Sequence, residues 1–237
     1  MEVAYFRPQR PGPESVIERT IADQIQNLFT SEANTLWTAG SPPIGAGMPD
    51  LVAVSYEPQV FALAQTEMPT IHILAYLRVV GSARLETIIG RTGIPQKTTL
   101  RYLNDLVELK AVARVDDTYS LLPVWRQILP EIVTIEIKVT NWKRAIDQAA
   151  RNRIFSHRSF IALPDLVARR IRLEPILRQL GIGLLSVSDD NTISVVRRSR
   201  YHKPRVWKYY YEIAFLAAKY GKDLNNAIYC TYGSGSS

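Results

Sequence analysis

Two short apolar segments of this chain carry charged residues where a buried strand normally has none. Residues 48–52 (Met-Pro-Asp-Leu-Val) and 135–139 (Ile-Glu-Ile-Lys-Val) are short and rich in β-branched side chains, which is typical of buried strands. Burying an unpaired carboxylate costs several kcal/mol, so Asp50, Glu136 and Lys138 are tolerated only where they meet one another or a cation. We therefore expect these three side chains to converge at strand ends, an arrangement suited to divalent-metal chemistry on phosphates.

Helical and strand patterns alternate through most of the chain. Their order predicts an α/β fold with a mixed sheet flanked by helices. Residues 1–13 contain three prolines and residues 233–237 are Gly-Ser-Gly-Ser-Ser, so we expect both ends to be flexible. The expected helices are 14–29, 142–155, 166–180 (kinked or split at Pro175) and 206–220, and the expected strands are 36–38, 51–55, 132–139, 159–163, 184–188 and 192–197.

The segment 68–128 has a different pattern from the sequence on either side of it. It contains three expected helices followed by two short strands around Asp116-Asp117, at 70–80, 84–92, 96–109, 112–115 and 118–122. Three helices and a hairpin indicate a winged helix-turn-helix module. The predicted organisation is therefore a discontinuous core, 14–67 and 130–237, interrupted by this module.

Pro49-Asp50 at a strand start, followed by Glu136-x-Lys138 on a later strand, resembles the PD-(D/E)XK nuclease superfamily. That group includes type II restriction enzymes, Holliday-junction resolvases and repair nucleases. The resemblance covers roughly residues 14–67 and 130–196 and implies a restriction-endonuclease-like core. Glu18 and Gln148 resemble positions that often face the active site, whereas Asn152 stands where a Tyr is usual. The spacing between Asp50 and Glu136 is longer than usual, and the inserted module accounts for it.

The chemistry of the candidate site also follows from the residue types. Asp50 and Glu136 supply the hard oxygen ligands that Mg²⁺ prefers, Mn²⁺ being a substitute, and the carbonyl of Ile137 is a further candidate ligand. Lys138 shares a strand face with Glu136, where it can orient water or stabilise charge in the transition state. Glu18 is a candidate for a second ion and Gln148 for orienting Lys138. The ordinary alternatives are a surface Glu136–Lys138 ion pair, a loop-capping Asp50, a solvated Glu18 and a surface amide at Gln148.

The inserted module supplies a first set of candidate DNA contacts. A winged helix places its third helix in the major groove and its hairpin against the backbone. The corresponding residues here are Gln96, Lys97, Thr98, Thr99, Arg101 and, in the wing, Arg114. Asp116 and Asp117 at the wing tip oppose phosphate contact, so the alternative is a protein-interaction or dimerisation module.

Positive charge increases along the chain. Residues 1–67 carry 3 basic and 8 acidic side chains, whereas residues 127–237 carry 18 basic and 9 acidic ones. A basic C-terminal half indicates a polyanionic partner, most simply nucleic acid. The candidate backbone contacts are Lys143, Arg144, Arg151, Arg197, Arg198, Arg200, Lys203 and Arg205. The alternative for residues 197–205 is a solvated linker.

Together these patterns predict a Mg²⁺-dependent DNA endonuclease in which the winged helix positions the DNA. The alternative is a DNA-binding regulator, or an assembly protein dependent on a partner subunit, with an inactive nuclease-like core. Duplex, branched and single-stranded DNA and RNA fit the same charges, and a homodimer suits cleavage of both strands. The single cysteine, the lack of a signal-like N-terminus and the lack of a long apolar run favour a cytoplasmic protein without membrane contact.

Overall fold

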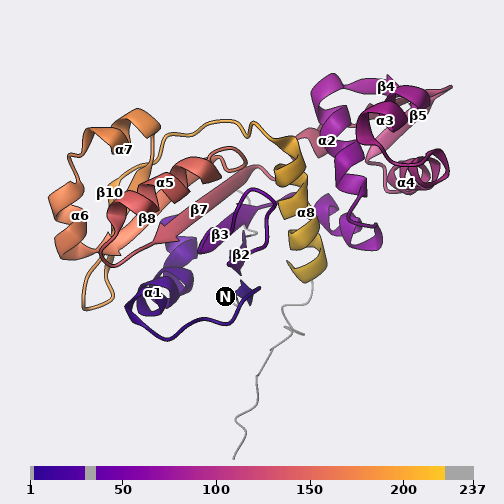
Figure 1. Ribbon diagram of the computed structural model, residues 1–237. Coiled ribbons are helices and arrows are strands. Elements are labelled where there is room, and N and C mark those ends of the chain that lie inside the picture. The colour runs from indigo at the N-terminus through magenta and orange to yellow at the C-terminus, as the bar shows by residue number, and fades with distance from the viewer. Residues whose placement is uncertain (1–2, 30–35, 222–237) are drawn as a thin grey trace, which may run out of the picture.

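A computed structural model describes residues 3–29 and 36–221; the predicted flexible tail, 233–237, lies outside these ranges. Within them, the strands outside the inserted module form a seven-stranded sheet (Figure 1). In spatial order these strands are β1 (Ala4–Tyr5), β2 (Leu36–Gly40), β3 (Leu51–Ser55), β7 (Glu131–Ile137), β8 (Arg158–Pro164), β9 (Gly183–Val187) and β10 (Ile193–Arg197).

The sheet is mixed. Strands β7, β8 and β9 are parallel, whereas β3 pairs antiparallel with β2 on one side and with β7 on the other. Strand β10 is antiparallel to β9, and β1 adds a short parallel pairing beside β2. The structure therefore confirms the predicted mixed α/β sheet. It also places β1 within residues 1–13, which we had expected to be irregular.

Helices cover both faces of the sheet (Figure 1). The alternation along β7 sends Val133, Ile135 and Ile137 to one face, where they pack with Ile21 and Ile25 of α1 (Pro13–Leu28). The opposite face of β8 and β9 packs against three helices, which are α5 (Trp142–Asn152), α6 (Asp165–Ile171) and α7 (Pro175–Leu180). The predicted helix 166–180 is split between α6 and α7 because Pro175 begins the second helix and cannot continue the first.

The inserted module contains the three expected helices and a three-stranded sheet. Residues 82–84 pair with the second strand of the predicted hairpin, so the second helix begins at Leu85. A left-handed Asp116, with φ 51°, lies at the hairpin turn. The elements are α2 (Thr70–Val80), β4 (Ser82–Arg84), α3 (Leu85–Thr92), α4 (Gln96–Glu108), β5 (Val112–Val115) and β6 (Thr118–Leu121).

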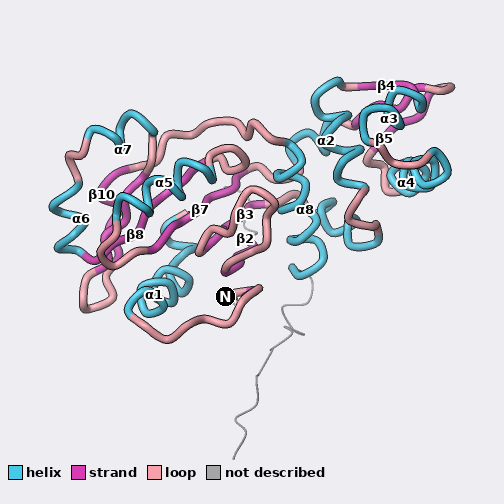
Figure 2. Tube along the Cα trace, viewed as in Figure 1, coloured by secondary structure: helices cyan, strands magenta, loops and turns pink. Residues whose placement is uncertain are grey.

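Helix α8 (Trp207–Gly221) joins the module to the large sheet (Figure 2). It packs against α2 and against the 3₁₀ helix η1 (Pro58–Gln65), and a second 3₁₀ helix, η2 (Pro123–Gln127), follows β6. The buried hydroxyl of Tyr210 donates to the Leu129 carbonyl at 3.1 Å, and that of Tyr211 donates to the Trp125 carbonyl at 2.7 Å. One apolar cluster thus runs from Val52 through α8 into the module.

No helix among the described residues is long and apolar enough to cross a membrane.

Candidate active site

Asp50 and Glu136 meet at one end of two adjacent strands. Leu51 of β3 pairs with Ile135 of β7 in antiparallel register, so the preceding Asp50 lies opposite the following Glu136. The backbone N–H of Ile137 donates to Asp50 Oδ2 at 2.7 Å, which fixes the carboxylate against β7. Strand pairing therefore brings together two residues that are far apart in the sequence, as the charged strand pattern predicted.

Lys138 completes this group. Its side chain is only 14% exposed, and its Nζ lies 3.3 Å from Asp50 Oδ2 and 3.5 Å from Glu14 Oε2. The ammonium also donates to the carbonyl of Ile137. Lys138 thus bridges Asp50, which directly precedes β3, and Glu14 on α1, and it already uses the Ile137 carbonyl that the sequence suggested as a metal ligand.

Glu136 is the most constrained carboxyl group of the site. It is 1% exposed, and its Oε1 accepts a 2.7 Å hydrogen bond from Asn152 Nδ2 on α5. Its Oε2 is buried and has no hydrogen-bond partner among the described residues. Burial, reinforced by the neighbouring Asp50 charge, raises the pKa of Glu136 to about 8. This group therefore lacks a nearby positive charge sufficient to ionise it at neutral pH.

Helix α1 brings two further carboxylates to the site. Glu14 and Glu18 are one helical turn apart, and Glu14 forms the ion pair with Lys138 described above. Glu18 accepts a 3.0 Å hydrogen bond from Gln9, and burial raises its pKa, with a smaller contribution from Asp50 in the same direction. The sequence predicted Glu18 but missed Glu14, although the spacing of the two acids was a usable signal.

Helix α5 contributes a polar stripe facing the sheet. Gln148 and Asn152 are four residues apart and so share one helix face. Asn152 orients Glu136, whereas Gln148 Oε1 is buried without a hydrogen-bond partner among the described residues. Asn152, noted from the sequence only as a departure from a family pattern, is therefore the better-defined contact of the two.

The donor set suits a divalent cation. Glu136 Oε2 is a buried oxygen without a partner among the described residues, and Asp50 lies opposite Glu136 at the start of the neighbouring strand. A cation there would satisfy that oxygen and favour the ionised form of Glu136. Within the described ranges, however, no three His, Cys, Asp or Glu side chains are grouped closely enough to hold a metal ion. The Lys138 ammonium instead contacts both Asp50 and the Ile137 carbonyl.

The predicted DNA contacts of the module have mixed outcomes. Thr99 is fully buried and its hydroxyl donates to the Ile94 carbonyl at 3.0 Å, so its assignment to a DNA-facing surface was wrong. Arg101 forms a 2.6 Å ion pair with Glu67, and Arg114 Nε donates to the Asp116 carbonyl at 2.9 Å. Gln96 and Lys97 are exposed, and Thr98 is half-buried.

The module and the candidate site lie at opposite ends of the central strands. The chain leaves the sheet after Ser55 and returns at Glu131, whereas Asp50 and Lys138 flank the other ends of β3 and β7. A seven-residue strand spans about 23 Å. The structure therefore does not bring the module's predicted DNA contacts together with the carboxylates.

The remaining predicted DNA contacts lie on α5 and on the segment 197–206. Lys143, Arg144 and Arg151 are exposed on α5. Residues 198–206 form a strap whose backbone N–H groups donate four hydrogen bonds to the core. These run from Arg200 N to Gly181 O (3.0 Å), from His202 N to His157 O (3.1 Å), and from Arg205 N and Val206 N to Ile154 O (2.8 and 2.9 Å). The strap exposes Arg198, Arg200, Lys203 and Arg205, while Arg197 is half-buried and donates to the Arg172 carbonyl. These four exposed cations belong to none of the ion pairs of the described residues.

Comparison of the chain with protein-family models, with curated proteins and with solved structures finds no match.

Proposed function

We propose that this protein is a divalent-metal-dependent DNA endonuclease whose active site is the Asp50–Glu136–Lys138 group. The observation that carries the proposal is the buried Glu136 Oε2, which has no hydrogen-bond partner in the described structure and lies across from Asp50. Such an oxygen is costly unless a ligand uses it. A fully structural Glu136 would be expected to have both oxygens satisfied.

Asp50 and Glu136 are the residues that would hold Mg²⁺ or Mn²⁺. When bound, such an ion polarises a phosphate oxygen and lowers the pKa of coordinated water. Asn152 holds Glu136 by one oxygen and leaves the other free for the ion. Lys138, whose Nζ lies 3.3 Å from Asp50 Oδ2, would orient the attacking water or stabilise the charge that develops on the phosphate. Glu14, whose Oε2 lies 3.5 Å from Lys138 Nζ, would help to keep the ammonium at the site.

One observation favours the alternative of an inactive, DNA-binding core. Lys138 contacts Asp50 and the Ile137 carbonyl simultaneously, so an internal cation already serves two of the predicted ligands. In that case the group would be a structural ion-pair network, and the exposed cations on α5 and on the strap would act in binding alone. A partner subunit that rearranges Lys138 would be a third possibility.

The test is cleavage of supercoiled plasmid, a synthetic four-way junction, single-stranded DNA and RNA, with Mg²⁺ or Mn²⁺ against EDTA. Wild type is compared with Lys138→Ala, and Lys219→Ala is the matched control because Lys219 is exposed on α8. Metal-dependent cutting by wild type and Lys219→Ala, lost in Lys138→Ala, supports the proposal, and the substrate that is cut defines the specificity. Metal-independent binding without cutting by any variant overturns it in favour of the inactive core.

The oligomeric state is measured in the same samples by light scattering. A nuclease that cuts both strands of a duplex commonly needs two active sites, so a dimer with plasmid linearisation supports the expected homodimer. A monomer that only nicks the plasmid contradicts it.

A further inference from the structure

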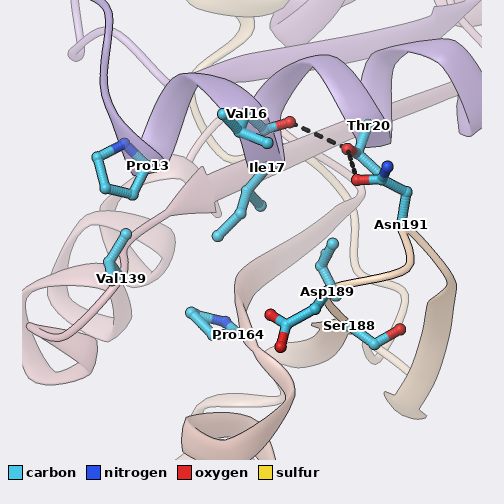
Figure 3. Close-up of a pocket in the computed structure, with 10 residues that line it drawn as sticks. Pro13, Val16, Ile17, Thr20, Val139, Pro164, Ser188, Asp189 and Asn191 are labelled. Carbon is cyan, nitrogen blue, oxygen red and sulfur yellow. Dashed lines mark hydrogen bonds between the residues drawn. The ribbon is translucent and has the colours of Figure 1, made fainter.

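A cavity lies beside the Lys138 group, at the edge of the sheet where the parallel strands end. Its volume is about 310 Å³. Its lining comes from α1, from Val139 just after β7, from the last residues of β8 and β9, and from the β9–β10 turn (Figure 3). Two of its lining residues, Pro13 and Val139, directly neighbour Glu14 and Lys138 in the chain. The Glu14–Lys138 ion pair therefore adjoins the wall of the cavity.

The cavity has apolar walls and a polar end. Figure 3 shows Val16 and Ile17 of α1 on one side and Val139 and Pro164 on the other, with Asp189 and its neighbours closing the end. Apolar surfaces on two sides suit a flat, poorly hydrated group. The carboxylate of Asp189 supplies a hydrogen-bond acceptor at the polar end.

The β9–β10 turn is held firmly against α1. The Thr20 hydroxyl lies 3.0 Å from Asn191 Oδ1, and Gln24 Nε2 donates to the Asn191 carbonyl at 3.0 Å. Asn191 adopts a left-handed conformation, with φ 63°, which asparagine tolerates better than most residues. These contacts fix the distance between the polar end and the helical wall, so the shape of the cavity is largely preformed.

The charge of the lining indicates whether a phosphate group or a nucleobase fits the cavity better. None of the ten lining residues is basic, and Asp189 is acidic, so the lining disfavours a phosphate group. Asp189 is exposed and forms no hydrogen bond or ion pair with another described residue, which leaves both of its oxygens available as acceptors. A nucleobase has two apolar faces and N–H donors on its edge, and it fits both features.

We propose that this cavity receives one unstacked nucleobase of the nucleotide next to the scissile phosphate, with its N–H edge on Asp189. The proposal rests on the proposed nuclease function and deepens it by defining the substrate. It implies that the enzyme prefers DNA in which a base beside the cut is unpaired or easily extruded, as at a junction, a flap or a mismatch. Extrusion from a stable duplex would carry the additional cost of unstacking.

The first test follows the base directly. After the cut position is mapped with wild type, 2-aminopurine is placed at each flanking position, and its fluorescence is recorded with Lys138→Ala and Mg²⁺. We expect a severalfold increase at one flanking position only, because 2-aminopurine is quenched by stacking. Trp substitution of Val16, which lines the cavity and is 58% exposed on α1, should abolish that increase by filling the space.

The second test is a double-mutant cycle between the cavity and the base. An abasic nucleotide at the responding position should lower kcat/KM of wild type roughly tenfold, about 1.4 kcal/mol of lost contact. It should lower kcat/KM of Val16→Trp by little more, because that variant has already lost the contact. Val79→Trp is the matched control, since Val79 is 69% exposed on α2 and lies outside the cavity.

The outcomes separate this proposal from the function on which it rests. Cutting by wild type with no fluorescent position, or an equal abasic penalty in wild type and Val16→Trp, overturns the nucleobase pocket and leaves the nuclease intact. A wild-type protein that cuts no nucleic acid overturns the nuclease and the pocket together.

Discussion

The two ends of the central strands differ in whether the predicted functional residues have partners within the protein. At the site end, Glu136 Oε2 and Gln148 Oε1 are buried without partners in the described structure. At the module end, the predicted contacts Thr99, Arg101 and Arg114 all have partners within the chain, although Thr70 Oγ1 at the start of α2 is buried without one among the described residues. Unsatisfied buried polar atoms are rare and need a reason, whereas polar groups that already have partners need none. We therefore expect a ligand first at the site end, where the atoms without partners belong to predicted site residues, even though the module supplied more candidate contacts.

The largest expected effect is the loss of cleavage in Asp50→Asn. This change keeps an oxygen that can accept from Ile137 N but removes the charge opposite Glu136. We expect kcat to fall by about 10²–10³, as when a key transition-state contact is removed elsewhere. Arg101→Ala in the module is the comparison variant, and initial rates on the preferred substrate measure both. A larger loss for Arg101→Ala would reverse the ranking of the two ends.

The next effect concerns stability as a function of pH. The pKa of Glu136 is raised to about 8, so the folded state favours the neutral carboxyl group. The stability that this preference adds to the free energy of unfolding is fully present below pH 4.5 and is lost as the pH rises toward 8. Glu136→Gln cannot ionise, so wild type should become less stable than this variant by on the order of 4 kcal/mol over that window. Urea unfolding at pH 4.5, 6.5 and 8.5 measures it. A stability difference that does not change with pH would show that Glu136 is not held in its neutral form.

A complementary test measures the effect of Mg²⁺ on thermal stability at pH 8.5. Excess Mg²⁺ should raise the melting temperature of wild type and leave that of Glu136→Gln nearly unchanged, because ligand binding to the folded state alone stabilises it. Equal increases in the melting temperatures of wild type and Glu136→Gln would show that the cation binds at a site that does not include Glu136.

A smaller effect is expected for Asn152→Ala. This change removes the 2.7 Å hydrogen bond to Glu136 Oε1 and leaves a second buried oxygen without a partner. The cost should be about 1–3 kcal/mol in the free energy of unfolding. Ala150→Gly on the same helix is the control for helix propensity, at about 1 kcal/mol. A cost no greater than that control would show that water or Gln148 replaces the lost donor.

The smallest expected effect is a change in DNA affinity at the module end, and it tests directly whether the module contacts DNA. Glu67 pairs with Arg101 on the exposed face of α4, so Glu67→Gln should release the guanidinium for a phosphate. We expect DNA affinity to increase by a few fold, mostly at low salt, as measured by fluorescence anisotropy. Unchanged affinity would assign the exposed face of α4 to something other than DNA.

Much of this arrangement was predictable from the sequence. Charged residues in β-branched segments identified Asp50, Glu136 and Lys138, because burial makes such charges informative without any alignment. The helical spacing of apolar residues identified α1, α5 and α8. The position of the insertion also follows from chain order. Residues 56–130 connect the end of β3 to the start of β7, and Asp50 lies before β3, so the insertion must be at the other end of these strands.

Other features depend on contacts that no local pattern encodes. Asn152 and Glu14 gain their roles from the packing of α5 and α1 against the strand ends, and Thr99 lost its expected role through a bond to Ile94 in the preceding turn. Strand β1 forms because Ala4 and Tyr5 find a free edge beside β2, not because two residues have strong strand propensity.

Helix α8 has a consequence for the order of assembly during synthesis. It follows every strand of both sheets in the chain, yet its buried Tyr210 and Tyr211 belong to the apolar cluster that the large sheet shares with the module. On a ribosome, both sheets therefore emerge before the helix that covers their common surface. That surface stays exposed until residues 207–221 arrive, which makes the nascent chain, rather than the finished protein, the form most in need of a chaperone.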